Sequence, residues 1–327
     1  MRRPDIADLV QRAQRGEQLA VARLISLVED GGPDLPAVAS ALAAHAGRAH
    51  VVGLTGPPGV GKSTTTSELI RVLRAQGRRV GVLAVDPSSP FSGGALLGDR
   101  VRMGEHTTDD GVFIRSMATR GHLGGLARAT PHALRVLDGA GCDVVLIETV
   151  GVGQSEVEVV ALADTTVVLL APGAGDGVQA AKAGLLEVAD VFVVNKADRD
   201  GADQTVRDLR RMLSLGVGSD VAAAGGCTEG WRVPVQRAVA ARGDGVPELV
   251  DLLDAHRRWL DSSGERERRR LARAGAEIQA IALDRVRVRL DEVRGADGVP
   301  ALAERVLAGE LDPYRAAAEL TGRMGLD

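Results

Sequence analysis

The sequence is poor in aromatic residues and cysteine. Aromatic side chains make up only 2% of 327 residues, so leucine, valine and alanine must fill the core that a 45% apolar content allows. Small apolar side chains suit helices packed closely on a parallel sheet. The two cysteines, Cys142 and Cys227, form no Cys-x-x-Cys pair or Cys/His cluster, which argues against a disulfide framework and a structural zinc site.

Strong positive charge and long apolar runs are also missing. A net charge of -4 provides no basic field for nucleic acid or an anionic membrane. The Arg-dense run Glu265–Arg273 contains acids as well, which is typical of a solvated helix face. Acids such as Glu158 and Asp164 interrupt the longest apolar stretches, and no apolar segment follows the start of the chain. We therefore expect a soluble cytoplasmic protein with no nucleic-acid or membrane partner.

The order of sequence patterns predicts an α/β fold with helical extensions at both ends. Residues 1–48 show helical spacing, and residues 49–262 contain short, continuous apolar runs separated by helix-like segments. Such runs indicate strands covered on both faces, in a doubly wound and mostly parallel sheet. Ligands bind such sheets at the carboxyl ends of the strands. The predicted strands are 51–54, 80–85, 144–147, 166–170 and 191–194.

Residues 263–327 are predicted to be helical again. Leu271, Ala274, Ile278 and Ile281 share one helix face. A last helix is expected to start with Asp312 as N-cap, because proline follows at the first helical position. This tail is too small to fold alone, so its apolar face must pack on the main domain or on a second chain.

A complete Walker A motif directly follows the first predicted strand and opens a helix. The glycines let backbone N–H groups surround phosphate oxygens, and the helix N-terminus adds positive charge. Lys62 is predicted to neutralise phosphate charge, and Ser63 to bind Mg²⁺. The predicted phosphate-binding residues are Gly56, Pro57, Pro58, Gly59, Val60, Gly61, Lys62, Ser63 and Thr64.

The run Asn195-Lys196-Ala197-Asp198 follows the strand 191–194 and predicts guanine recognition. The Asp198 carboxylate can accept from guanine N1–H and the exocyclic amine, whereas adenine presents no matching pair of donors. A site built for such donors rejects a base that lacks them. Asn195 and Lys196 are expected to brace the base and the loop.

Two acids follow strands on the phosphate side of the predicted sheet. Asp86 ends the second strand, and Glu148 ends the third. Carboxylates there suit Mg²⁺ or its bound waters, although either acid could instead cap the following helix. Gly-rich segments after the strands are typical of nucleotide-dependent switches or of flexible surface, and Gln154 in one of them could orient the attacking water. The predicted catalytic residues are Lys62, Glu148 and Gln154.

Longer strings around these motifs resemble the MeaB/ArgK family of GTPases across nearly the whole chain. The most specific are Met117–Gly125, Glu148–Glu156 and Pro172–Asp176. The resemblance implies a GTPase chaperone that gates cobalamin loading of an adenosylcobalamin-dependent acyl-CoA mutase, chiefly methylmalonyl-CoA mutase, and protects it. It also implies a homodimer, formed here through residues 263–327. Carried over by motif, Ser63, Asp86, Asp99 and Glu148 form the metal shell and switches, and Asp176 and Lys182 signal the nucleotide state.

One loop departs from the family pattern. Where the second guanine-contacting loop commonly reads Thr-Ser-Ala, this chain has Ala238-Val239-Ala240. A backbone N–H at Val239 or Ala240 can still bind the guanine oxygen, but the hydroxyl groups that would steady the loop are lost. Three other functions stay open. A nickel- or zinc-delivering GTPase predicts Cys/His clusters, which the sequence lacks. Asp198 argues against a transport-linked ATPase or kinase, and the intact Lys62 and Ser63 argue against a nucleotide-binding scaffold without turnover.

Overall fold

The structure is a computed structural model that describes residues 5–86, 104–106, 108–118, 129–149, 161–173, 188–216, 230–292 and 298–323. The chain divides into two compact units, Met1–Arg266 and Glu267–Asp327. The first unit contains the sheet and the predicted nucleotide motifs, and the second contains helices only in its described part.

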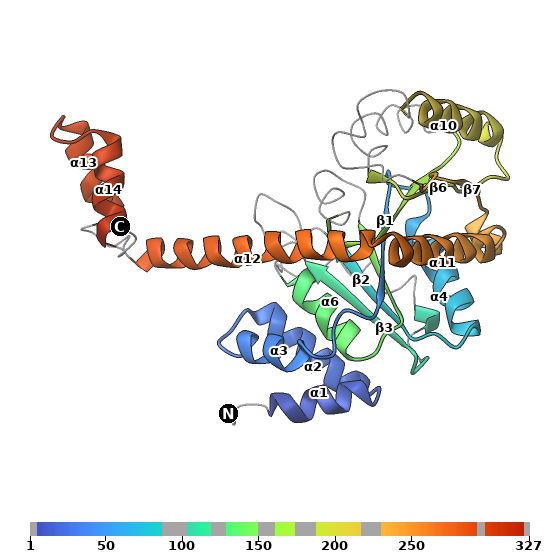
Figure 1. Ribbon diagram of the computed structural model, residues 1–327, viewed down its shortest axis with the longest axis horizontal. Coiled ribbons are helices and arrows are strands. Elements are labelled where there is room, and N and C mark those ends of the chain that lie inside the picture. Colours follow the sequence, from blue (N-terminus) through green and yellow to red (C-terminus); the bar gives the residue numbers. More distant parts are fainter. Residues whose placement is uncertain are drawn as a thin grey trace. The chain divides into compact units, whose positions relative to one another are not determined.

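The described residues form one seven-stranded sheet in the order β3-β2-β4-β1-β5-β6-β7, with every neighbouring pair parallel (Figure 1). The predicted α/β class with a doubly wound parallel sheet is confirmed. The strands are β1 His50–Thr55, β2 Val80–Asp86, β3 Val112–Ala118, β4 Val144–Thr149, β5 Thr165–Leu170, β6 Val191–Val194 and β7 Val235–Arg237.

The two edge strands carry little signal in the sequence. Strand β3 has Arg115 and Ser116 at its centre, and β7 has only three residues, none of them buried. An edge strand is covered less completely than a central one, so polar side chains are tolerated and the continuous apolar run disappears. In contrast, the central strands β1, β4, β5 and β6 are buried along their whole length.

Helices cover both faces of the sheet. Helices α4 (Lys62–Ala75) and α11 (Val246–Ser263) share a core cluster with Val144 and Leu146 of β4. Residue Val145, between these two, belongs instead to the cluster of α6 (Thr130–Gly139) and the N-terminal helices, because successive strand residues point to opposite faces. Helix α10 (Ala202–Gly216) packs against β6 and β7.

The N-terminal helices are part of the same core rather than a separate body. They are α1 Ile6–Gln14, α2 Gln18–Asp30 and α3 Leu35–Leu42. Leu24 and Ile25 of α2 are completely buried, and α2 packs on α6. Leu42 lies so close to Gly139 of α6 that a Cβ there would come within 2.6 Å of its Cδ2 atom. The predicted helices in residues 5–48 are thus observed.

The segment that leads from α3 into β1 is held by the Asp138 carboxylate of α6. Asp138 is buried and accepts hydrogen bonds from the backbone N–H groups of Gly47, Arg48 (3.0 Å) and Ala49 (2.8 Å). Backbone groups removed from water need such partners. Since β1 runs directly into the predicted phosphate loop, this carboxylate fixes the start of the strand that carries the loop.

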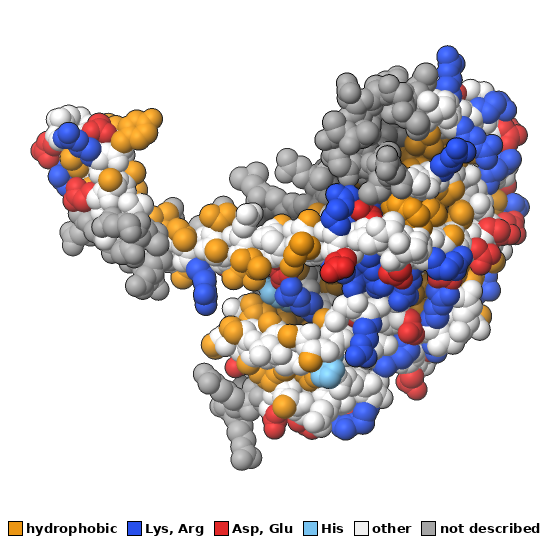
Figure 2. All heavy atoms as spheres, in the orientation of Figure 1, with side chains coloured by type: hydrophobic (Ala, Val, Ile, Leu, Met, Phe, Trp, Pro, Cys, Tyr) orange, Lys and Arg blue, Asp and Glu red, His pale blue; other side chains and the backbone are white. Residues whose placement is uncertain are grey.

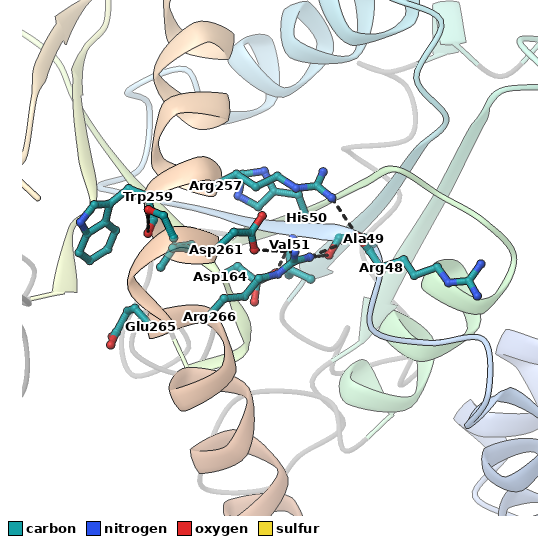
Figure 3. A network of polar contacts seen from close by, with 12 residues as sticks. Arg48, Ala49, His50, Val51, Asp164, Arg257, Trp259, Asp261, Glu265 and Arg266 are labelled. Atoms are coloured by element: carbon teal, nitrogen blue, oxygen red, sulfur yellow. Dashed lines mark hydrogen bonds and ion pairs between the residues drawn. The ribbon is translucent and has the colours of Figure 1, made fainter.

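Arginines hold the carbonyl groups of the same segment (Figure 3). The Arg266 guanidinium donates to the carbonyl oxygens of Arg48 and Ala49, each at 3.2 Å, and to Asp261 at 3.0 Å. Arg257 of α11 donates to the Arg48 carbonyl at 3.2 Å. Donors and acceptors before β1 are therefore both satisfied by side chains from distant parts of the sequence.

The amino ends of the central strands carry a buried hydrogen-bond chain. His50 Nε2 lies 2.7 Å from Thr165 Oγ1, which lies 2.8 Å from His256 Nδ1. His256 Nε2 in turn lies 3.3 Å from an Asp190 carboxylate oxygen. Burial lowers the pKa of His50 to about 3, so this imidazole stays neutral at ordinary pH. Because the strands are parallel, this row of hydrogen-bonded side chains lies at the end of the sheet opposite the predicted nucleotide site.

Replacing Asp138 with alanine is expected to lower the free energy of unfolding of the first unit by about 2 kcal/mol, because the buried Ala49 N–H loses its acceptor. The two tryptophans, Trp231 and Trp259, both lie in this unit and pack around His256, so urea unfolding followed by tryptophan fluorescence reports on it. Asp34→Ala is the matched control, because the Asp34 side chain makes no capping hydrogen bond. Equal stability of the two variants would contradict the assignment.

The second unit contains most of α12 (Glu265–Glu292) and the helices α13 (Val299–Leu307) and α14 (Pro313–Arg323). Asp312 caps α14 as predicted, since its carboxylate accepts from the N–H groups of Tyr314 and Arg315 at 2.9 and 3.0 Å. Arg305 of α13 joins Glu319 of α14 at 2.9 Å, which ties the two helices into a hairpin. No helix in the described part of the chain is long and apolar enough to cross a membrane.

Apolar side chains lie exposed along α12 (Figure 2). Leu271 and Ile278 are 74% and 68% exposed and stand seven residues apart, which places them on one helix face. The other exposed large apolar residues of this helix are Ile281, Leu283, Val286 and Val288. The apolar stripe that contains Leu271 and Ile278 is a surface suited to a protein partner.

Candidate nucleotide-binding site

The predicted phosphate loop joins β1 to α4, and close packing requires glycine at two of its positions. Gly56 has φ +140°, and a Cβ there would lie 2.2 Å from the Leu169 carbonyl oxygen of β5. Gly61 has φ +96°, and a Cβ there would lie 2.4 Å from the Asn195 side-chain nitrogen. Any larger residue at either position would push the loop away from the neighbouring strands.

Lys62 is the first residue of α4, and its amine lies within the loop. Its Nζ atom donates to the carbonyl oxygens of Gly56 at 2.6 Å and Pro57 at 3.1 Å, and the residue is 7% exposed. The first turn of α4 contains no acidic residue, so the positive end of its helix dipole is not neutralised there. The lysine and the helix N-terminus together make an anion site of the kind that binds phosphate.

Ser63 and Glu148 are brought together by the fold, 85 residues apart in the sequence. Ser63 Oγ donates to Glu148 Oε1 at 2.6 Å, and Thr66 Oγ1 donates to Glu148 Oε2 at 3.0 Å. All three are buried. A carboxylate beside a serine hydroxyl supplies the hard oxygen donors that Mg²⁺ prefers, so these residues fit a magnesium ion. Thr66 was not among the residues predicted for the site, although its i+3 spacing from Ser63 places both hydroxyl groups on the same helix face.

Other predicted metal and catalytic residues are placed only in part. The backbone of β2 ends at Asp86, two residues beyond Ala84, which lies opposite Glu148 in the sheet register. Asp86 is therefore the last residue of β2 and Glu148 the last but one of β4, so both acids lie at the carboxyl ends of neighbouring strands. Asp99, Gln154, Asp176 and Lys182 lie outside the described part of the chain.

Asn195 connects three segments of the site. Its side-chain nitrogen donates to the Val60 carbonyl of the phosphate loop at 2.8 Å, and its side-chain oxygen accepts from the Ala240 N–H at 3.0 Å. Asn195 is 2% exposed and is the first residue after β6. One buried amide thus fixes the phosphate loop relative to the predicted base-binding loop.

Lys196 also reaches the phosphate loop. Its amine donates to the Gly59 carbonyl oxygen at 2.6 Å. Among the described non-glycine residues it is the one with positive φ, at 55°, a conformation that costs free energy and that surrounding contacts must hold. The next residue supplies such a contact, because the Ala197 N–H donates to the Ala238 carbonyl at 3.0 Å.

The two residues predicted to bind the guanine oxygen use their backbone N–H groups for hydrogen bonds within the protein. The Val239 N–H donates to the Asp244 carbonyl at 2.9 Å, and the Ala240 N–H donates to Asn195. A short helix, η4 (Ala240–Arg242), follows. Asp198 is exposed at the same place, with its carboxylate 4.0 Å from Arg242.

These groups all lie at the carboxyl ends of β1, β4, β6 and β7, where the sequence predicts a nucleotide. A model of the family described as methylmalonyl Co-A mutase-associated GTPase MeaB matches residues 21–294. The chain belongs to the MeaB family. Membership together with the phosphate-loop architecture makes it a GTP hydrolase that binds guanine nucleotides.

Known proteins agree with this placement among MeaB proteins. An inferred GTPase of Pyrococcus abyssi is 47% identical over 312 residues, which cover 95% of this chain and 94% of that protein. The mouse protein named mitochondrial methylmalonic aciduria type A homolog is 40% identical over 270 residues, covering 81% and 63%. A crystal structure described as a LAO/AO transport system kinase superposes with a TM-score of 0.72 at 25% identity, and 99% of each chain is covered.

Proposed function

We propose that this MeaB-family GTPase uses Mg²⁺-dependent GTP hydrolysis to gate the loading of adenosylcobalamin into an acyl-CoA mutase, with methylmalonyl-CoA mutase as the first candidate. The observation that carries the proposal is the family match over residues 21–294, whose description names that mutase. The name of the mouse relative, which refers to methylmalonic aciduria, points to the same metabolism.

The site residues support a role for each part of the nucleotide. Lys62 and the backbone N–H groups at the start of α4 would bind the β- and γ-phosphates and stabilise the charge that develops as water attacks the γ-phosphorus in line. Ser63 and Glu148, with Asp86 and Asp99, would hold Mg²⁺, which neutralises phosphate charge when bound. Gln154 is proposed to orient the attacking water.

The guanine base would be read by Asp198 and by the loop before α11. The Asp198 carboxylate would accept from N1–H and the exocyclic amine, as the sequence predicts. Because the N–H groups of Val239 and Ala240 are engaged elsewhere, the predicted contact with the guanine oxygen would pass to Ala241, the next residue of η4.

The exposed apolar stripe of α12 would form a homodimer. Leu271 and Ile278 present the largest exposed apolar surfaces on the helix, and two copies of such a stripe can cover one another. A second copy would remove this surface from water. Dimerisation is thus proposed for the second unit, while nucleotide chemistry belongs to the first.

Phosphate release from GTP tests the proposed partner. An adenosylcobalamin-dependent mutase from the same source is expected to raise the turnover of this chain about tenfold or more, because partner proteins complete the catalytic site of many GTPases. The Lys62→Ala protein mixed with the same mutase supplies the blank. If turnover is present but the mutase leaves it unchanged, the GTPase assignment stands and the proposed partner is wrong.

A further inference from the structure

Arg242 lies at the end of η4 with its guanidinium between two carboxylates. Its Nε atom is 3.0 Å from Asp244 Oδ2, and its NH1 group is 4.0 Å from Asp198 Oδ2. These distances mark a firm contact to Asp244 and a looser one to Asp198. The guanidinium therefore connects the residue predicted to read the base with the loop that follows.

The loop that presents Arg242 is held in place by backbone contacts. The Arg242 N–H donates to the Val239 carbonyl at 2.8 Å, and Val239 forms a bridge with Asp244. Gly245 follows with φ +77°, and a Cβ there would lie 2.1 Å from the Arg237 carbonyl oxygen. Because the turn is this tight, Asp244 occupies a defined position from which it can hold Arg242.

We infer that Arg242 is a positioning residue that sets the base specificity of the nucleotide site through Asp198. The inference rests on the proposed role of Asp198 in reading guanine. The Asp198 side chain is 43% exposed, and the contact with Arg242 is the only ion pair to it among the described residues. With one oxygen drawn toward the guanidinium, the carboxylate is biased toward one orientation, in which both of its oxygens face the base.

Arginine suits this role better than lysine. Its planar guanidinium keeps its charge and carries several N–H groups in fixed directions, so one side chain can contact Asp244 and Asp198 at once. A lysine ammonium is a point charge on a flexible stem. Arg242→Lys should therefore retain the charge near Asp198 and lose most of the orientation.

A comparison of nucleotides that carry guanine and hypoxanthine distinguishes this positioning role from a general effect of Arg242 on the loop. Guanine offers N1–H and an exocyclic amine to the carboxylate, whereas hypoxanthine offers N1–H alone. A carboxylate that can rotate still serves one donor but aligns less often with two. Removing Arg242 should thus weaken the binding of GDP more than the binding of IDP, the diphosphate whose base is hypoxanthine. Damage to the loop would weaken the binding of both nucleotides equally.

The test is calorimetric titration of the full chain with GDP and IDP at low ionic strength. Arg242→Ala is expected to raise the Kd for GDP about two- to fivefold, the range given by exposed ion pairs, with little change for IDP. The preference for GDP over IDP falls by the same factor. At about 1 M salt, where such pairs are screened, wild type and variant should converge.

Arg237→Ala is the matched control, since Arg237 also forms an exposed ion pair, with Asp203 at 2.6 Å, on the strand that leads into the same loop. This variant should bind GDP and IDP with the same Kd values as the wild type. Equal weakening of GDP and IDP by Arg242→Ala, or no effect on either, would overturn the inference. Asp198→Asn, titrated in parallel, shows whether Asp198 reads the base at all, so a failure there is distinguished from a failure at Arg242.

Discussion

Replacing Lys62 with alanine is expected to reduce GTP turnover about 10²- to 10³-fold, with loss of nucleotide affinity. The Lys62 amine lies within the phosphate loop, 2.6 Å from the Gly56 carbonyl and 3.1 Å from that of Pro57, and only 7% of the residue is exposed. A preorganised charge in such a site stabilises the negative charge of the transition state by about 3–4 kcal/mol. Phosphate release under saturating GTP, together with GDP binding, measures both effects.

The control for Lys62→Ala is Arg207→Ala, which also removes one positive charge, from the exposed face of α10. It should retain wild-type turnover. Lys62→Arg adds a second comparison, since it keeps the charge but replaces the compact ammonium that contacts the Gly56 and Pro57 carbonyl groups with a larger, planar guanidinium. If Lys62→Ala hydrolyses GTP at the wild-type rate, residues 56–63 do not form the phosphate site.

Replacing Asp198 with asparagine is expected to exchange the base preference from guanine to xanthine. The carboxylate accepts two hydrogen bonds from guanine in the proposed complex, while an asparagine amide presents one donor and one acceptor and matches the reversed pattern of xanthine. Guanine keeps one hydrogen bond, now to a neutral oxygen, while its exocyclic amine faces the asparagine amine, so GTP binding should weaken about a hundredfold or more. XTP should become the better substrate, as measured by kcat/KM for the two nucleotides.

Asp200→Asn is the matched control for this exchange. It makes the same change of charge two residues further along the same loop, at another exposed position. The control should keep its preference for GTP. Unchanged GTP affinity in Asp198→Asn would show that another residue reads the base, and it would leave the phosphate-loop assignment untouched.

The sequence alone predicts the central strands and the ligand-binding motifs because both depend on local patterns. Continuous apolar runs locate β1, β2, β4, β5 and β6, since strands buried on both faces need apolar residues at every position. Gly56 and Gly61 are identified by a short motif, and their positive φ values agree with it. The choice of guanine follows from one four-residue run, because the hydrogen-bonding pattern of a carboxylate is independent of the rest of the fold.

The edge strands and several supporting contacts could not be predicted in this way. Strand β7 is recognised only by its pairing with β6, since three half-exposed residues have no period of their own. The three N–H groups from which Asp138 accepts hydrogen bonds belong to residues about ninety positions away in the sequence. No local pattern marks an aspartate near the end of a helix as the partner of a distant segment.

The sequence by itself determined the fold class, the phosphate loop and the preference for guanine, because each is encoded within a few neighbouring residues. Only the tertiary structure decided which groups meet at the site: Thr66 joins Ser63 on Glu148, Asn195 links the phosphate loop to Ala240, and Arg242 faces Asp198. These contacts depend on strand order and register, which bring segments together irrespective of their separation in the sequence. Contact between distant segments is a property of the packed sheet, and a linear pattern does not contain it.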